Sequence, residues 1–425
     1  MDRILNRICS IGNHPVACLD ENFRLRYVTG LASCLYALSK GSDVSRMFFS
    51  VWANSIVGND VDSKGLWHED IKAAVKAISI QRKGIKFFSM KYHFLFDVFY
   101  LLQDIHSGNK GGSTLETTRQ YLEEKVCGWY TKRALQEVFD HFKSGTPCHG
   151  INKALSEHRE LNESHCRQKE KRVLVVANVS AGKSTLINAL IGCQLNRTKT
   201  TACTSRITEI HNKPSYDGLT IKTLKGTYRY YDDTEAVSSD AFISAALHFK
   251  SAMDSASICL IDTPGINNAE ESEHRRITEE AINGGDYDAM IYVSNCQYFG
   301  TNDEHYILEL LKKYVRKPIF FVLNQLDNFR QKDDSISKML NDYVSDLVKM
   351  GFKAPKIFPV SAKAALLFKL AEAKMDEEDN EIKAMVERKF QKDYFDLPHY
   401  LGVGGTTHLL ERTGITYLEK ELFHL

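Results

Sequence analysis

The 425-residue sequence lacks several features that would place it in particular protein classes. Its ten cysteines include no C-x-x-C pair and no regular spacing, which argues against disulfides or zinc ligands and favours buried thiols in a reducing compartment. The formal net charge of +1 argues against a large electrostatic footprint for nucleic acid. Residues 1–11 mix charged and single apolar residues, so we expect no signal peptide and a cytoplasmic location.

Long apolar runs and prolines are also scarce in the first third of the chain. The most apolar run, Phe94 to Leu102, is interrupted by Asp97 and is too short to cross a bilayer. It fits a buried core helix better than a helix that dips into a membrane. Apolar residues recur at helical spacing from 22 to 144, which predicts an all-helical region. The three tryptophans are interpreted as packing anchors: Trp52, Trp67 and Trp129.

What the sequence does contain begins with a motif between Arg172 and Leu190. An apolar run predicts a buried strand, a loop of small residues follows, and Gly-Lys-Ser opens a helix. This arrangement is typical of a P-loop, in which backbone N–H groups and the helix N-terminus bind phosphates. The residues assigned to the nucleotide here are Ala177, Ser180, Ala181, Gly182, Lys183, Ser184 and Thr185.

Two residues of this motif have distinct expected roles, and one departs from the usual pattern. We expect Lys183 to reach the β- and γ-phosphates and the Ser184 hydroxyl to bind Mg²⁺. Ala177 stands where the pattern has its first glycine. Because alanine tolerates positive φ poorly, at a cost of about 1 kcal/mol, the sequence predicts a slightly altered turn at this position.

A second motif, Asp262-Thr263-Pro264-Gly265, follows the apolar run 258–261. At the carboxyl end of a strand, Asp262 can hold Mg²⁺ through water and the Gly265 N–H can sense the γ-phosphate.

Two further motifs are expected to contact the nucleotide base. Asp327 ends Asn324-Gln325-Leu326-Asp327, and its carboxylate can accept hydrogen bonds from the two guanine donors, a pair that adenine does not offer. The triplet Ser361-Ala362-Lys363 can supply a backbone N–H for the guanine O6. Four motifs in this order, each after an apolar strand, predict a guanine-nucleotide-binding domain with GTP or GDP as ligand.

The segment from Ser180 to Gly192, followed by Ala202-Cys203-Thr204 and 206–210, resembles the bacterial dynamin-like GTPases. The resemblance spans about 170–425 and implies that Thr204 is the switch threonine, which ligates Mg²⁺ and holds the attacking water. It further implies that Ser180 helps to hold a monovalent cation, K⁺ or Na⁺. The catalytic residues that follow are Ser180, Lys183, Thr204 and Gly265. Gln325 replaces the usual lysine of the base-reading motif.

The chain is expected to divide into three parts. Residues 1–150 are predicted to form the helical region, 151–170 a polar helical linker or neck, and 171–425 the GTPase domain. From 171 onward strands and helices alternate, which predicts an α/β fold with a mostly parallel sheet and helices on both faces. Between Thr204 and Asp262 we expect two antiparallel strands, at 220–224 and 227–231, and a helix at 234–249.

Three functional interpretations remain open from the sequence. The favoured one is a GTP-hydrolysing dynamin-like enzyme that couples self-association through its GTPase domain to the remodelling of a membrane or partner, peripheral to the membrane if one is bound. The alternative is a regulatory switch whose helical region binds a protein. The least favoured is an RNA- or ribosome-associated GTPase of the Era type, because no basic RNA-binding module is found and no nucleic-acid partner is expected.

Overall fold

The computed structural model describes residues 4–5, 7, 9–58, 61, 64–79, 90–103, 111–178, 180–195, 206–232, 242–264, 272–297, 299–330 and 335–425. It consists of two compact units. The first contains Met1–Gln168 and Thr220–Asp232, and the second contains Lys169–Leu219 and Asp233–Leu425. No helix among the described residues is long and apolar enough to cross a membrane.

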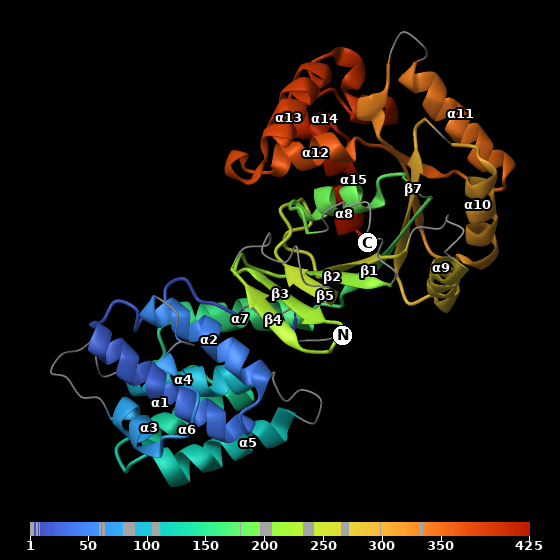
Figure 1. The fold of residues 1–425 in the computed structure, drawn as a ribbon. Helices are drawn as coiled ribbons and strands as arrows, with labels where there is room; N and C mark the ends of the chain where they lie inside the picture. Colours follow the sequence, from blue (N-terminus) through green and yellow to red (C-terminus); the bar gives the residue numbers. More distant parts are fainter. Residues whose placement is uncertain are drawn as a thin grey trace. The chain divides into compact units, whose positions relative to one another are not determined.

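The first unit is mostly helical, which confirms the predicted helical N-terminal region (Figure 1). Its helices are α1 (Glu21–Ser39), α2 (Asp43–Val57), α3 (Ile71–Ile78), α4 (Met90–Leu102), α5 (Gly111–Tyr121), α6 (Lys132–Ser144) and α7 (Lys153–Arg167). A π-helical turn at Leu122–Val126 follows α5. The strands β3 (Leu219–Thr223) and β4 (Tyr228–Tyr231) form a hairpin, closed by a hydrogen bond from Thr223 N–H to the Thr227 carbonyl (2.8 Å).

Helix α4 is the centre of the first unit, and the prediction of a buried core helix is confirmed. Phe94, Phe96 and Phe99 are each at most 1% exposed. Asp97 on the same helix is also fully buried, where an unpaired carboxylate would be costly. It accepts hydrogen bonds from Tyr27 Oη (2.7 Å) and lies 3.1 Å from His14 Nε2, so the polar group is satisfied inside the core.

The tryptophans behave differently from one another. Trp52 is fully buried in this core and Trp67 packs partly against it, as predicted. Trp129 is 87% exposed, so the prediction that it is a packing anchor is wrong. It lies in the turn between the π-helical segment and α6, where the chain faces solvent.

The second unit contains a mostly parallel sheet. Its strands are β1 (Lys171–Ala177), β2 (Thr208–Asn212), β5 (Phe242–Leu247), β6 (Ile258–Asp262), β7 (Ala289–Asn295), β8 (Ile319–Asn324) and β9 (Lys356–Pro359). They lie in the order β5-β2-β6-β1-β7-β8-β9. Strand β1 is parallel to both β6 and β7, whereas β2 is antiparallel to β6. Residues of β1 and β6 are buried on both faces, which explains their continuous apolar sequence.

Helices cover both faces of this sheet, which confirms the predicted fold class (Figure 1). The helix α8 (Lys183–Ile191) lies with α12 (Ala362–Lys369), α13 (Glu377–Phe390), α14 (Leu409–Arg412) and α15 (Ile415–Phe423). The opposite face carries α9 (Ser272–Gly284), α10 (Asn302–Tyr314) and α11 (Ile336–Lys349). Parallel strands therefore end at one edge, where the motif loops follow β1, β6, β8 and β9.

The predicted helix at 234–249 is wrong for its described part. Residues Phe242–Leu247 form β5, which pairs in parallel with β2, including Ala246 opposite His211. Alanine favours helices in isolation, but Ala245 and Ala246 are fully buried in this strand. Sheet pairing and burial therefore override the local propensity.

Candidate functional site

The P-loop joins the buried end of β1 to the N-terminus of α8. Ala177 is the last residue of β1 and has no positive φ, so alanine carries no backbone strain at this position. The left-handed residues are Ser180 (φ 60°) and Gly182 (φ 82°). A Cβ on Gly182 would lie 2.6 Å from Asn324 Nδ2, so glycine is needed here for close approach as well as for backbone conformation.

The next residues place a cation and an anion side by side. Lys183, which is buried in the first turn of α8, forms an ion pair with Asp262 Oδ1. Asp262 ends β6 and is fully buried. Ser184 and Thr185 are half-buried in the same turn of α8. Lys183 and two of the three expected Mg²⁺ ligands, Ser184 and Asp262, thus lie at the carboxyl edge of the sheet.

Asn324 connects three of the four motif loops. It ends β8 and is 1% exposed. Its Nδ2 donates to the Ala181 carbonyl of the P-loop (2.9 Å), and its Oδ1 accepts from the Ala362 N–H (3.0 Å). The sequence predicts that the triplet Ser361-Ala362-Lys363 supplies a backbone N–H for guanine, and in the structure the Ala362 N–H of that triplet bonds to Asn324.

Gln325 makes a second connection to the P-loop. It is left-handed (φ 66°), and its Nε2 donates to the Ser180 carbonyl (2.7 Å). Its Oε1 accepts from Asn295 Nδ2 (3.0 Å), at the end of β7. The Cys296 thiol donates to the Gln325 carbonyl (3.2 Å), and burial raises the pKa of this thiol to about 12, which keeps it neutral. Sequence reasoning missed Asn295 and Cys296, because no motif contains them.

Asp327 is held from two sides. Its Oδ1 accepts from Ser361 Oγ (2.7 Å), so the carboxylate predicted to read the base is oriented by the Ser-Ala-Lys loop. Its backbone carbonyl accepts from Lys389 Nζ, on α13. The Lys363 ammonium forms an ion pair with Asp379 Oδ1 (2.6 Å), so its charge is already neutralised by that carboxylate. Lys389 was not predicted, since it lies 62 positions from Asp327.

The D-T-P-G loop is fixed at its start. Thr263 Oγ1 donates to the Val175 carbonyl (2.8 Å), and Thr278 Oγ1 on α9 donates to the Pro264 carbonyl (3.1 Å). The predicted catalytic residues Thr204 and Gly265 lie outside the described residues. Their roles therefore stay predictions, as do those of the remaining predicted site residues.

The assembled site has the chemistry that a nucleoside triphosphate requires. Lys183, the α8 N-terminus and the P-loop backbone offer positive charge and N–H donors for phosphates. Asp262 and Ser184 offer oxygen ligands that suit Mg²⁺, which usually takes few protein ligands and the phosphates of its substrate. Asp327 offers a carboxylate for the base. The residues present therefore fit a magnesium–nucleotide complex.

Comparison with known proteins agrees with this geometry. Residues 173–326 match the Dynamin family. GTPase Era of Histophilus somni (strain 129Pt) is 24% identical over 195 residues, which is 45% of this chain and 49% of Era. GTPase Der of Mycoplasmoides gallisepticum is 30% identical over 161 residues, 37% of this chain and 32% of Der. The chain thus spans about half the length of the Era proteins it matches.

Among solved structures, Era in complex with MgGDPNP and nucleotides 1506–1542 of 16S ribosomal RNA matches with a TM-score of 0.29 and 18% identity. The match covers 52% of this chain and 57% of that one. The selenocysteine-specific elongation factor EF-Sec matches with a TM-score of 0.30 and 18% identity, over 52% of this chain and 29% of that one.

These comparisons correct one prediction. The sequence predicts no nucleic acid among the partners, together with self-association and a membrane or protein partner. That partner prediction is contradicted, because the relatives are Era proteins and an Era structure was solved with 16S ribosomal RNA bound. The family match, the Era and Der relatives and the arrangement of the motif loops all agree on one more general assignment. The chain contains a P-loop GTPase domain.

Proposed function

We propose that this protein binds GTP with Mg²⁺ and hydrolyses it to GDP and phosphate. The observation that carries the proposal is the junction at Asn324, which ties the P-loop to the Ser-Ala-Lys loop while Ser361 orients Asp327. The groups proposed to bind phosphate and those proposed to read the base are thereby linked in one site. Preorganised groups of this kind reduce the ordering cost of binding.

The mechanism is mainly one of positioning and charge. Lys183 would neutralise the β- and γ-phosphates, while Asp262 and Ser184 would hold the Mg²⁺ that neutralises the developing charge. Lys183 and Asp262 form an ion pair, and on nucleotide binding Lys183 would turn to the phosphates while Asp262 would become free to hold the metal. Thr204 is proposed to complete the Mg²⁺ shell and to hold the attacking water.

The test is phosphate release by the full chain with GTP or ATP, with and without Mg²⁺. We expect Mg²⁺-dependent release from GTP and little from ATP, because Asp327 pairs with guanine donors that adenine lacks. Equal rates with the two nucleotides would refute the guanine assignment. No release from either would refute hydrolysis, and a separate binding measurement would then show whether a GTP-binding site survives.

A finer proposal concerns the cation that speeds hydrolysis. Ser180 is exposed on the P-loop, and its carbonyl accepts a hydrogen bond from Gln325 Nε2. We propose that its side chain helps to hold K⁺ or Na⁺ beside the β–γ bridge oxygen, as the dynamin resemblance implies. Rates should then depend on the monovalent cation, and Ser180→Ala should remove that dependence. A rate that is the same in K⁺, Na⁺ and a bulky organic cation would contradict it.

A concentration series distinguishes the two kinds of relative. A specific activity that rises with protein concentration favours the dynamin type. A flat one favours a switch of the Era or Der type.

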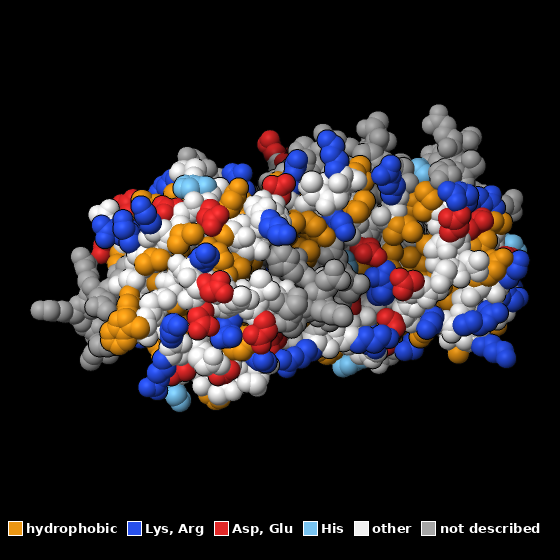
Figure 2. Space-filling view, turned by 90° about the horizontal axis from the view of Figure 1, so that it is seen from below, with side chains coloured by type: hydrophobic (Ala, Val, Ile, Leu, Met, Phe, Trp, Pro, Cys, Tyr) orange, Lys and Arg blue, Asp and Glu red, His pale blue; other side chains and the backbone are white. Residues whose placement is uncertain are grey.

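The Era relatives support a second candidate, that this protein contacts RNA in its GTP state. On the face shown in Figure 2, lysine and arginine side chains are interspersed with acidic ones. Binding through such a surface would rely on few phosphate contacts and would depend weakly on salt. Retention of RNA by the protein with a non-hydrolysable GTP analogue, and not with GDP, would support the candidate. Absence of retention at low salt would exclude it.

A further inference from the structure

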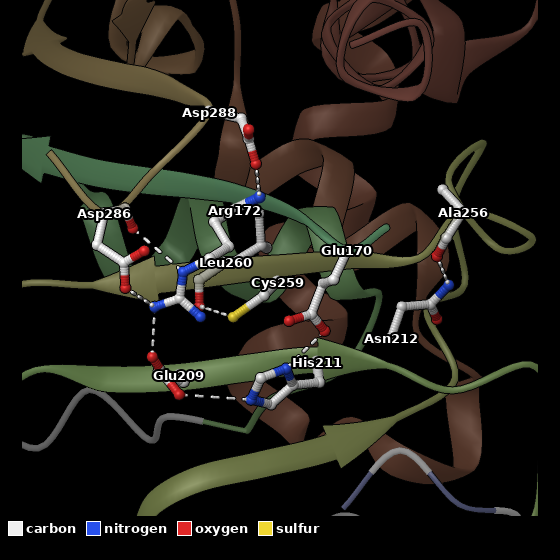
Figure 3. A network of polar contacts seen from close by, with 10 residues as sticks. All are labelled: Glu170, Arg172, Glu209, His211, Asn212, Ala256, Cys259, Leu260, Asp286 and Asp288. Carbon is white, nitrogen blue, oxygen red and sulfur yellow. Dashed lines mark hydrogen bonds and ion pairs between the residues drawn. The ribbon is translucent and has the colours of Figure 1, made fainter. Parts of the chain in front are cut away.

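A compact cluster of metal-binding side chains lies in the second unit, away from the nucleotide loops. It consists of Glu170, His211 and Cys259 (Figure 3). Cys259 is near the start of β6, whereas the phosphate-side residue Asp262 is at the end of the same strand. The two positions are three residues apart along the strand, or about 10 Å. The cluster therefore has no part in the proposed nucleotide chemistry.

The sheet itself brings these donors together. His211 on β2 lies directly opposite Cys259 on β6 in the antiparallel register, so their side chains share one face. Arg172 on β1 lies opposite Cys259 on its other side. Side chains alternate along a strand, so Glu170, two residues before Arg172, and Glu209, two residues before His211, project to the same face.

The donor atoms are close enough for one ion. One ligand atom from each of the three residues lies within 4.8 Å of those of the other two. Glu170 Oε1 is 2.8 Å from His211 Nδ1. In a tetrahedral zinc site with bonds near 2.0–2.1 Å, oxygen and nitrogen ligands are about 3.3 Å apart. A movement of about half an ångström would therefore admit the ion between these two atoms.

The surroundings of His211 match those of a metal-bound imidazole. A ligating histidine usually donates its other ring N–H to a carboxylate, which fixes the ring. His211 Nε2 is buried, has no hydrogen-bond partner within normal distance, and lies 3.6 Å from Glu209 Oε2. Glu209 is in turn held by Arg172 Nη2 at 2.6 Å. Nδ1 is thus the ring nitrogen directed at the cluster, and Nε2 the one directed at the supporting carboxylate.

We propose that Glu170, His211 Nδ1 and Cys259 bind one Zn²⁺ ion. A thiolate, an imidazole and a carboxylate form a ligand set that zinc accepts and that calcium or magnesium does not favour. Cys259 and His211 are 0% and 1% exposed, and three protein ligands leave a fourth tetrahedral position for a water molecule. The Glu209 side chain is 32% exposed and leaves a side from which an ion can enter.

The ion would cross-link β2, β6 and the residue that leads into β1. Zinc and the two anionic ligands would form a neutral unit, and the Glu209–Arg172 pair beside it would stay balanced. Cysteine spacing did not predict such a site, because the three ligands come from segments 41 and 48 positions apart. The role inferred is stabilisation of the sheet, and it does not depend on the proposed GTP hydrolysis.

The competing explanation uses the same residues without a metal. Glu170 and Glu209 would then hold a protonated His211 from both sides, with Cys259 as a packed thiol. The two explanations differ in metal content and in the response to chelators. They also differ in what happens when Cys259 becomes serine, which a packed thiol tolerates far better than a zinc ligand does.

The experiment measures zinc in full-length protein purified without a histidine tag and passed through gel filtration after exposure to ZnCl₂. We expect about one zinc per chain in the wild type and in Cys193→Ser, a matched buried cysteine of the same unit, and less than about a tenth in Cys259→Ser and His211→Gln. Glu209→Gln should weaken zinc affinity about 10- to 100-fold, as expected for a supporting carboxylate.

Two further readouts keep the proposal refutable if a variant folds poorly. Replacing zinc by Co²⁺ in the wild type should give a thiolate-to-cobalt charge-transfer band in the near ultraviolet, and Glu170→Gln should shift the visible cobalt bands. A chelator should lower the melting temperature of the wild type and leave that of Cys259→Ser unchanged. A well-folded wild type that holds no zinc after exposure, or that keeps its zinc in Cys259→Ser, would overturn the proposal.

Discussion

Replacing Asn324 by alanine tests whether the nucleotide loops are held together by one buried side chain. The amide makes a bond to the Ala181 carbonyl (2.9 Å), a weaker one to the Gly182 carbonyl (3.5 Å), and accepts from the Ala362 N–H (3.0 Å). Alanine removes all three. The Ala362 N–H then lacks a partner in a buried place, and the Ala181 carbonyl loses one.

The size of the effect follows from these losses. An unsatisfied buried donor costs about 1–3 kcal/mol, and loss of an ordinary hydrogen bond about 1 kcal/mol more. Since GTP binding would have to restore the arrangement of the loops, we expect about 2–4 kcal/mol of lost binding free energy. That corresponds to roughly 30- to 700-fold weaker GTP binding, because each 1.4 kcal/mol is a factor of ten.

Titration calorimetry with GTP and GDP measures the change. Asn324→Asp is a matched comparison: it keeps an acceptor for the Ala362 N–H but turns a buried carboxylate oxygen toward the Ala181 carbonyl, so it should lose at least as much GTP binding as alanine. A second control is the thermal melting of each variant, which separates a folding defect from a binding defect. GTP affinity of Asn324→Ala within about threefold of the wild type, below roughly 1 kcal/mol, would refute the role assigned to this residue.

Three other outcomes are expected. Asp327→Asn should weaken GTP binding by more than tenfold and improve binding of xanthine nucleotides, because an amide donor then faces the guanine donors; calorimetry with unchanged GTP affinity would contradict the base-reading role. Lys183→Ala should abolish tight nucleotide binding while Thr204→Ala spares binding and removes hydrolysis, as binding and single-turnover assays can show; a Thr204→Ala protein that hydrolyses GTP at the wild-type rate would place the switch threonine elsewhere. Burial lowers the pKa of His93 to about 4 from its ordinary 6.5, so its contribution to stability is present above pH 6.5 and is lost as the pH falls toward 4. The free energy of unfolding, measured with urea, should fall by about 2 kcal/mol between pH 7 and pH 5 because of this residue, and it should fall less in His93→Leu. Equal decreases in the two proteins would exclude His93 as the titrating group.

Much of the GTPase domain could be predicted from short stretches of sequence. The P-loop, D-T-P-G, N-Q-L-D and S-A-K motifs each follow an apolar run, and the structure places a buried strand before each of them. Such patterns are local, since burial on both faces of a strand requires continuous apolar residues. The order of the motifs along the chain was sufficient to predict that they meet at the carboxyl edge of one sheet.

Other features were decided only by contacts between distant residues. Phe242–Leu247 forms β5 because it pairs with β2, although its alanines favour a helix in isolation. Alanine fits at position 177 because the left-handed residues of the P-loop are Ser180, whose carbonyl bonds to Gln325, and Gly182. Trp129 is exposed because its turn faces solvent.

The sequence by itself therefore determined most strands and helices of the GTPase domain, β5 being the exception, and it predicted which loops would carry the nucleotide chemistry. The tertiary structure decided which residues support those loops, such as Asn295 and Lys389, and which donors meet on the far part of the sheet. Glu170, His211 and Cys259 come together only because β2 pairs with β6 and β6 with β1 in one register. The physical reason is that propensity and periodicity act over a few residues, whereas strand order and register depend on the packing of the whole sheet.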